Sequence, residues 1–427
     1  MNRRDFLDKT VKAGLVFSIV PRSVLGGTGY LSPSDRINLG FIGVGKQSYW
    51  LMESLSKCKE VAIHAASDVY EQKLNNFIAE TNKVQANLGK PSVDIKGYGL
   101  YRELLERSDI DAVVIASPDH WHAQMAVDAA KAGKDIYCEK PLASTIAEGR
   151  AMVDAARKYK RVFQTGSMQR SSFNFRQAVE LVRNGLIGEV KEVNVSIGGP
   201  VKQCDLPTMP IPAGLNWDQW VGPSLYRGYN PVLAPSLTDE DWAGWRWYRD
   251  FGGGYICDWG AHMFDIVQWA LDMDNSGPVL FTPPKDPTAT HGLSFVYKNG
   301  IKVNHVLWGE HNAIQFIGTK GKIEVSRSFI RTNPENLASL KMTQQDKRVY
   351  FSDNHYQDWI DAIKKRSKPI CDVEIGHRTS SVCNAVNIAY ELQHELKWDP
   401  KKEEFDHGYA NMMRSRPYRG QWDFRAF

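Results

Sequence analysis

The stretch that decides the fold is RINLGFIGVGKQS, at residues 36–48. Its first part has the apolar pattern of a short strand, and a segment typical of a helix follows to residue 57. The turn between them consists of Gly43, Val44, Gly45, Lys46, Gln47 and Ser48. This is a G-x-G-x-x-G spacing with serine in the third glycine position. The two glycines permit a tight turn and let a pyrophosphate approach the helix N-terminus. Since the third glycine mainly relieves crowding, Ser48 is a mild departure. We predict that Gly43, Val44, Gly45, Lys46 and Gln47 bind a dinucleotide.

The next strand pattern, EVAIHAAS at residues 60–67, ends at Asp68. An acid at this distance from the glycine turn is placed to accept hydrogen bonds from the adenosine ribose hydroxyls. A 2′-phosphate about 4 Å from that carboxylate would cost about 4 kcal/mol per charge at an effective dielectric of about 20. We therefore expect NAD rather than NADP, unless Lys73 compensates the charge.

Strand and helix patterns continue to alternate up to residue 165. They fall at residues 101–107 (helix), 111–116 (strand), 121–133 (helix), 134–138 (strand), 146–159 (helix) and 161–165 (strand). Such repeats predict a doubly wound parallel sheet of the Rossmann type, with its ligand at the carboxyl ends of the strands. We place this domain at residues 35–166.

Two strand ends in this half carry chemical groups. The segment SPDHWH at residues 117–122 offers a turn, a helix start and two imidazoles, although either histidine is equally typical of a core. The segment CEKP at residues 138–141 places Glu139 and Lys140 at a strand terminus. On an ordinary surface they form a solvated pair. Beside a bound nucleotide, Lys140 is a candidate to hydrogen-bond a reacting oxygen.

A third candidate segment is GGGYICDWGAHMFD, at residues 252–265. On a continuous helix from about 257 to 271, Asp258 and His262 lie one turn apart on the same face, and Asp265 joins that face. A carboxylate that orients an imidazole is a recurring general acid or base. The alternative is a helix N-terminus with acidic residues near its positive end and a satisfied histidine.

The second half, residues 167–400, has the pattern of an α+β domain. Alternating runs at residues 188–197, 292–297, 302–307, 313–317 and 322–325 predict a largely antiparallel sheet. Its free face suits a substrate wall or a homo-oligomer interface. The aromatic-rich segment 217–251, which includes Trp245, is either core or a platform for sugar rings. His377 and Arg378 either reach the substrate or start a helix. Residues 401–427 are expected to form a strap over the body.

Composition restricts the partners and the compartment. With 427 residues, 42% hydrophobic, 24% charged and a net charge of +4, the chain is typical of a soluble protein of two or three domains and not of a nucleic-acid binder. The six cysteines show no metal-site spacing, so we expect no metal. RRDFL at residues 3–7 resembles a twin-arginine export motif, and the apolar run behind it is too short to span a membrane. We predict a signal segment at residues 1–30 and a periplasmic protein, with an ordinary N-terminus as the alternative.

Together, the glycine turn, SPDHWH, EKP and the GGG…DxGxHxxD segment resemble the glucose–fructose oxidoreductase / inositol dehydrogenase / rhizopine-catabolism (Gfo/Idh/MocA) family, in an exported, Bacteroidetes-like type. The resemblance covers about residues 35–420. It implies that Lys140, Asp258 and His262 line the place where hydride leaves a substrate carbinol. We assign further residues to the cofactor (Ser117, Pro118, His122, Glu139, Gln169, and Lys140 in addition to its catalytic role) and to the substrate (Trp245, Asp265, His377, Arg378).

We therefore expect an NAD-dependent oxidoreductase that acts on a secondary hydroxyl of a sugar, glycoside or cyclitol. One alternative is a redox-neutral glycosidase that keeps NAD bound and uses transient oxidation to eliminate and rehydrate a glycosidic bond. Another is a sugar-binding protein without catalytic activity on the same fold.

Overall fold

The computed structural model describes residues 36–237, 242–343, 345–420 and 422. The predicted export segment, residues 1–30, lies outside the described residues. Among the residues that are described, no helix is long and apolar enough to cross a membrane.

Within the described chain, the first half forms a parallel sheet of six strands in the order β3-β2-β1-β4-β5-β6. The strands are β1 (Ile37–Ile42), β2 (Val61–Ser67), β3 (Lys96–Tyr98), β4 (Ala112–Ile115), β5 (Asp135–Cys138) and β6 (Phe163–Thr165). Every residue of β4 is buried, as expected for a strand covered on both faces. The order reverses at β1, which pairs with β2 on one side and β4 on the other. A crevice at such a point is the usual ligand site of this architecture.

Helices cover both faces of this sheet. The helices of this half are α3 (Lys46–Ser56), α4 (Glu71–Asn87), α5 (Tyr101–Leu105), α6 (His122–Lys131) and α7 (Ile146–Lys158). One core cluster joins α3 and α4 to one face, and another joins α5, α6 and α7 to the other. The first cluster also includes Trp359 of α12 (His355–Lys365), a helix that the chain adds much later.

The second half, as far as it is described, forms a nine-stranded sheet in the order β13-β12-β11-β7-β10-β9-β8-β14-β15. The strands are β7 (Val190–Ser196), β8 (Leu280–Thr282), β9 (Ser294–Val296), β10 (Lys302–His305), β11 (Ala313–Gly318), β12 (Lys322–Val325), β13 (Ile330–Asn333), β14 (Leu396–Asp399) and β15 (Glu404–Phe405). All neighbouring pairs are antiparallel except β7 with β10. The predicted α/β class, a parallel Rossmann-type sheet followed by a largely antiparallel one, is confirmed.

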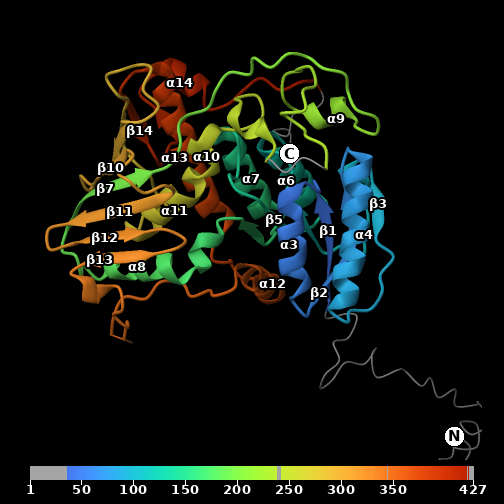
Figure 1. Ribbon diagram of the computed structural model, residues 1–427, viewed down its shortest axis with the longest axis horizontal. Coiled ribbons are helices and arrows are strands. Elements are labelled where there is room, and N and C mark those ends of the chain that lie inside the picture. The colour runs from blue at the N-terminus through green and yellow to red at the C-terminus, as the bar shows by residue number, and fades with distance from the viewer. Residues whose placement is uncertain (1–35, 238–241, 344, 421, 423–427) are drawn as a thin grey trace, which may run out of the picture.

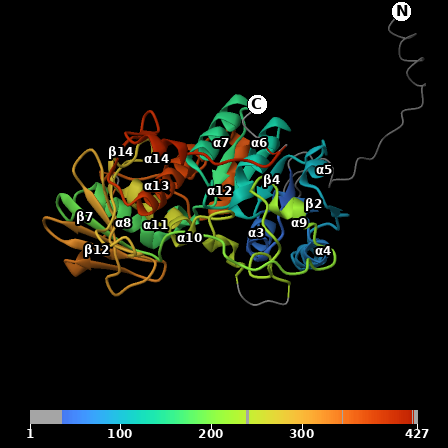
Figure 2. The same cartoon turned by 90° about the horizontal axis from the view of Figure 1, so that it is seen from above.

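Three helices of the second half pack on this sheet: α8 (Phe173–Arg183), α11 (Gly260–Ala270) and α13 (Val373–Leu392). Shorter helices are α9 (Trp217–Val221), α10 (Gly254–Asp258) and α14 (Gly408–Met412). Figure 1 shows the parallel sheet at one side, the orange antiparallel strands at the other, and α10 and α13 between them. In the turned view of Figure 2, α10 and α12 again lie between the two sheets. The prediction of one helix from 257 to 271 is wrong, because the chain breaks into α10 and α11 at Trp259.

The end of the described chain returns to the first half. The Arg416 guanidinium lies 2.8 Å from the Glu148 carboxylate of α7. The Trp422 ring meets the Trp121 ring edge-on, with centroids 5.0 Å apart. The tail therefore contacts the helices of the parallel sheet, and the domain boundaries stay predictions.

Candidate active site

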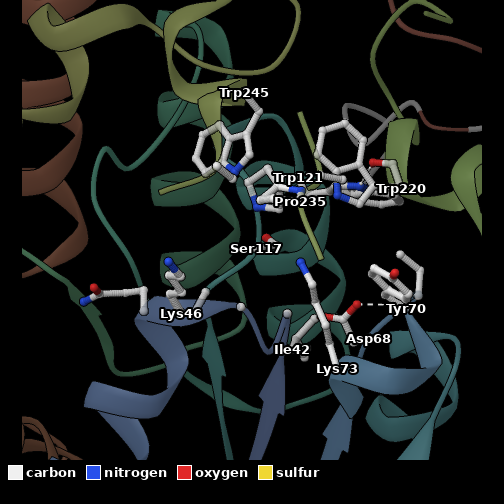
Figure 3. A pocket seen from close by; sticks show the side chains of 18 of the residues that line it. Ile42, Lys46, Asp68, Tyr70, Lys73, Ser117, Trp121, Trp220, Pro235 and Trp245 are labelled. Carbon is white, nitrogen blue, oxygen red and sulfur yellow. Dashed lines mark hydrogen bonds between the residues drawn. The ribbon is translucent and has the colours of Figure 1, made fainter. Parts of the chain in front are cut away.

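A cavity of about 280 Å³ opens at the carboxyl ends of β1, β2 and β4. Its floor includes Gly43, Gly45, Lys46 and Gln47 of the glycine turn, Asp68 after β2, and Ser117 and Pro118 after β4. Figure 3 shows Ile42, Asp68 and Lys46 on one side of it, and Trp245, Pro235 and Trp220 on the other. The structure thus brings together, around one cavity, predicted residues from three separate strand ends.

The two glycines of the turn serve different purposes. Gly43 has φ +79°, and a Cβ there would lie 2.6 Å from the Ser117 backbone nitrogen, so the neighbouring strand excludes any side chain. A Cβ at Gly45 would meet no heavy atom within 4 Å, because Gly45 faces the cavity. The Ser48 hydroxyl, where a third glycine is usual, donates to the Gly45 carbonyl at 2.6 Å.

Helix α3 begins at Lys46, and no side chain caps its first backbone N–H groups. Unpaired N–H groups at a helix N-terminus attract anions. A bare Gly45 beside them leaves room for a diphosphate, so this part of the cavity fits a dinucleotide.

Asp68 is fixed by the backbone around it. Its carboxylate accepts the Val44 N–H at 2.8 Å and the Tyr70 N–H at 2.9 Å. Burial raises the pKa of Asp68, while these hydrogen bonds and the positive charge of Lys73 act to lower it. Each carboxylate oxygen has lone pairs left for a ribose hydroxyl, so the arrangement fits the role predicted for Asp68.

The far wall of the cavity comes from the aromatic-rich segment. Trp217, Trp220, Tyr229 and Phe251 pack in one buried cluster, and the first two are stacked with centroids 4.5 Å apart. Most of the aromatic rings are therefore core. Trp220 and Trp245 also line the cavity whose floor is formed by the glycine turn. The structure thus places Trp245, which the sequence assigned to the substrate, opposite the nucleotide-binding turn (Figure 3).

Lys140 and Asp258 meet across the junction of the two halves. The Lys140 amine, just past β5, donates to the Asp258 carboxylate at 2.6 Å and to the Asp258 backbone carbonyl at 3.0 Å. Burial alone would raise the pKa of Asp258, but Lys140 and Arg246 outweigh it and the pKa is lowered. Asp258 is therefore an anion that holds Lys140. The predicted role of orienting the imidazole is corrected, because the break at Trp259 places the two side chains on separate helices.

His262 lies in the same cluster of charges. Its ring is buried, and Arg327 donates to its Nε2 atom at 3.1 Å. Since a guanidinium only donates, Nε2 is the acceptor and the ring proton sits on Nδ1. Burial, Lys140 and Arg327 lower the pKa of His262 well below 6.5. His262 is thus a neutral imidazole whose Nδ1–H has no partner among the described residues, an arrangement suited to donating a hydrogen bond.

Two arginines complete the cluster, and sequence reasoning missed both. Arg246 lines the cavity, stacks on Trp245 at 4.3 Å, and brings its Nε atom 3.9 Å from Asp258. Arg327 lies in the turn between β12 and β13, over the Trp259 ring at 4.6 Å. The only signal for Arg246 was its place among the tryptophans. The serines that flank Arg327 indicate a turn and nothing about a site.

Glu139 links the cluster to the glycine turn. Its carboxylate accepts from the Gln47 side chain at 3.1 Å, and a Cβ on Gly166 would lie 2.9 Å from it. Gln169 is also buried, and neither atom of its amide has a partner within the described chain. Glu139 is thus tied to the glycine turn, and the assignments of Glu139 and Gln169 to the cofactor stay predictions.

Two assigned substrate residues are turned away from the site. Every residue of α11 is buried, so its carboxylate must be neutralised internally: Asp265 accepts two hydrogen bonds from Arg170, both at 2.8 Å. His377 is fully buried, and its Nε2 atom lies 2.7 Å from Glu403. Both assignments are corrected, because helical spacing fixes the face of a helix but not what that face meets.

Two further assignments change for the same reason. Arg378 donates to Glu374, one turn earlier on α13, at 2.7 Å and is not part of the cluster. His122 is buried, with its ring nitrogens 2.9 and 3.0 Å from the carbonyl oxygens of Pro141 and Ser117. It supports the loops that carry Lys140 and Ser117 and does not face the cavity.

The described residues contain no group of three or more histidine, cysteine or acidic side chains placed to hold a metal ion. The groups that the structure gathers beside the cavity are an amine, an imidazole, two guanidinium groups and a carboxylate.

Comparison with known proteins points the same way. Residues 37–167 match the family described as "Oxidoreductase family, NAD-binding Rossmann fold", and residues 175–424 match "Oxidoreductase family, C-terminal alpha/beta domain". Both are components of the Gfo/Idh/MocA group.

Among curated proteins, "Glycosyl hydrolase family 109 protein 1" of Shewanella sp. (strain ANA-3) is 32% identical over 209 residues. That match covers 44% of this chain and 44% of the relative, less than half of its length.

Among solved structures, the aldose-aldose oxidoreductase of Caulobacter crescentus is 18% identical, covering 85% of this chain and 99% of that one, with a TM-score of 0.58. The WlbA dehydrogenase of Bordetella pertussis, in complex with NADH and UDP-GlcNAcA, is 16% identical with the same coverage and a TM-score of 0.60. At these identities the likeness establishes the fold.

Proposed function

The chain belongs to the Gfo/Idh/MocA family of NAD-binding oxidoreductases, and we propose that it oxidises a secondary hydroxyl of a sugar, glycoside or cyclitol. The observation that carries the proposal is the Lys140–Asp258 pair, with His262 in the same charge cluster. Arg246 joins this cluster to the dinucleotide-shaped cavity. A non-catalytic sugar-binding protein would have no need for an amine held by an anion at this junction.

When NAD is bound, it supplies the acceptor for the hydride. The turn at Gly43 and Gly45 and the start of α3 would hold its diphosphate, and Asp68 would hold its ribose hydroxyls. The electrostatic repulsion between a 2′-phosphate and the Asp68 carboxylate favours NAD over NADP. Lys73, which lies 5.3 Å above the Tyr70 ring, is the nearby cation that would reduce this preference.

The protein's own residues handle the proton. In the oxidising direction Lys140 first releases a proton to solvent and then takes the proton of the substrate hydroxyl, and Asp258 stabilises the ammonium that results. In the reverse direction the Lys140 ammonium returns that proton to the carbonyl oxygen. The Nδ1–H of His262 donates a hydrogen bond to the same oxygen or its neighbour and so orients the substrate. Trp220 and Trp245 exclude water from the cavity.

The direct test combines two measurements on the purified protein. Native mass spectrometry establishes whether NAD or NADP co-purifies, and absorbance of the reduced nicotinamide follows oxidation of a panel of sugars and inositols. We expect NAD, and turnover with at least one neutral or acidic sugar. Absence of any nucleotide, bound or titrated, contradicts the proposal.

A second function, a redox-neutral glycosidase with tightly held NAD, is favoured by one observation: the curated relatives in the 31–32% identity range bear the name glycosyl hydrolase family 109. The same Lys140 and His262 would serve a transient oxidation. Hydrolysis of a nitrophenyl glycoside in heavy water distinguishes the two. Deuterium gained in the sugar without release of NADH supports the glycosidase, whereas stoichiometric NADH supports the dehydrogenase.

Two further expectations remain proposals. Export to the periplasm is supported by Arg3 and Arg4 before an apolar run, and fractionation of cells that express the full chain tests it. A homo-oligomer through the nine-stranded sheet is supported by β10 and β12, in which exposed or half-buried residues alternate with buried ones. Light scattering after size-exclusion chromatography measures its mass.

A further inference from the structure

Arg327 stands out in the charge cluster because no carboxylate pairs with it. Its guanidinium lies over the Trp259 ring and donates to His262, and a neutral imidazole leaves the positive charge uncompensated. Among the described residues, no acidic oxygen lies within ion-pair distance of it. By contrast Arg331, four residues on, lies 2.6 Å from Glu310.

The acids around Arg327 are already engaged. Asp258 is bound to Lys140 at 2.6 Å, and Glu139 accepts from Gln47. Partial burial lowers the pKa of Arg327, and Asp258 and Glu139 offset this only from a distance. The residue as a whole remains exposed to solvent, so a ligand anion can reach the guanidinium and pair with it.

The whole cluster carries an excess of positive charge. Its cations are Lys140, Arg246 and Arg327, and its firmly ionised acid is Asp258. Burial raises the pKa of Glu139, and it raises the pKa of Asp119 well above the usual value. Of these three cations, Arg246 lines the cavity and the other two do not, so the excess lies beside the cavity, among the residues proposed to bind the substrate.

We propose that the substrate is an acidic sugar, whose carboxylate or sulfate ester is bound by Arg327 while Lys140 binds the hydroxyl to be oxidised. This inference rests on the proposed function. A guanidinium presents paired N–H donors that match the two oxygens of such a group. One N–H of Arg327 stays on His262, so a single residue fixes both the imidazole and the acidic group.

The test compares matched acidic and neutral ligands by calorimetry on the protein with its nucleotide. The ligands are methyl glucuronoside with methyl glucoside, methyl galacturonoside with methyl galactoside, and the 6-sulfates of glucose and galactose. We expect at least one acid to bind tenfold or more tightly than its neutral counterpart. Preference for a uronide identifies a carboxylate, and preference for a sulfate identifies the ester.

Two variants localise the effect. In Arg327→Gln the preference is expected to fall to within about twofold, while the glutamine amide can still donate to His262. In Arg331→Gln, a nearby exposed arginine that is already paired, the preference is expected to stay. Equal binding of acids and neutral sugars, no binding of any acid, or a preference that survives Arg327→Gln overturns the inference.

The readouts separate this inference from the proposed function. Oxidation of neutral sugars by the wild type, without tighter binding of any acid, leaves the oxidoreductase intact and removes the acid site. The opposite outcome is that acids bind in a way that depends on Arg327 but no sugar reduces the nicotinamide. That result supports the acid site and contradicts the oxidoreductase.

Discussion

The two halves of the molecule contribute to the site in different ways. In the parallel-sheet half, the glycine turn, Asp68, Ser117 and Lys140 each follow directly after a strand, and all lie at one edge of the sheet. In the second half, the contributing residues come from a short helix, a helix start and a hairpin turn. Asp258 and His262 come from one segment, but Arg327 lies 65 positions beyond His262 and reaches it only because their elements pack together.

The comparison shows where local pattern suffices. Parallel strands deliver their carboxyl ends to one edge regardless of side-chain detail, so a residue at a strand end is placed by topology. A helix offers several faces, and which one meets the cavity depends on every other contact. Asp265 and His377 illustrate this, since both occupy plausible helical positions and both pair inside the core.

The largest expected effect joins the two halves. Lys140→Ala removes the amine that Asp258 holds, so turnover with the true substrate should fall about a thousandfold. Nucleotide affinity should change little, because Lys140 lies outside the residues that line the cavity. Single-turnover kinetics measure the effect, and Lys298→Ala, at an exposed hairpin turn, is the control. Unchanged turnover would show that the junction is not catalytic.

Next in size is the core role of Asp265. Asp265→Asn leaves Arg170 partly uncompensated in a buried site, and we expect a loss of about 3 kcal/mol in the free energy of unfolding. Denaturant unfolding measures it. The matched control is Asp272→Asn, at a mostly exposed residue with φ +60°, where asparagine is tolerated and the loss should stay below about 0.5 kcal/mol. If Asp265→Asn kept full stability but lost affinity for the substrate, Asp265 would belong to the substrate site after all.

The pH dependence of the free energy of unfolding tests whether His120, in the SPDHWH segment, is buried as a neutral imidazole. Burial and Arg416 lower the pKa of His120 to about 3. Below pH 6.5 this histidine therefore becomes protonated in the unfolded chain but stays neutral in the folded protein. The free energy of unfolding thus decreases as the pH falls from 6.5 toward about 3. We expect His120→Gln to reduce this slope by up to about 1.4 kcal/mol per pH unit. Unfolding curves at several pH values measure both slopes, and identical slopes would show that His120 is accessible.

The smallest effect separates the two glycines. Gly45→Ala adds a methyl group only to the cavity, so NAD affinity should fall about tenfold while the melting temperature stays constant. Gly43→Ala forces a side chain against the Ser117 backbone at a positive φ, so stability should fall by at least about 1 kcal/mol. Calorimetry of NAD binding and thermal unfolding, on both variants, measure the contrast. If Gly45→Ala bound NAD as tightly as the wild type, the diphosphate would not bind beside Gly45.

The sequence placed most helices and strands, and the limits of that prediction have physical causes. The strand at residues 322–325 was predicted with the bounds that the structure has. The short strands β8, β13, β14 and β15 were missed, because pairing across the sheet stabilises them and their own patterns are too brief. The break at Trp259 was missed because apolar residues continue through it.

By itself, the sequence determined the parallel sheet, its order of strand and helix, the glycine turn and the amine at residue 140. These depend on periodicity and on the conformational freedom of glycine, which act over a few neighbouring residues. Only the tertiary structure decided that Asp258 holds Lys140, that Arg327 fixes His262, and that Asp265 and His377 turn inward. A charged or polar side chain takes whichever partner the packing brings within about 3 Å, and the partners named here lie 26 to 118 positions apart in the chain.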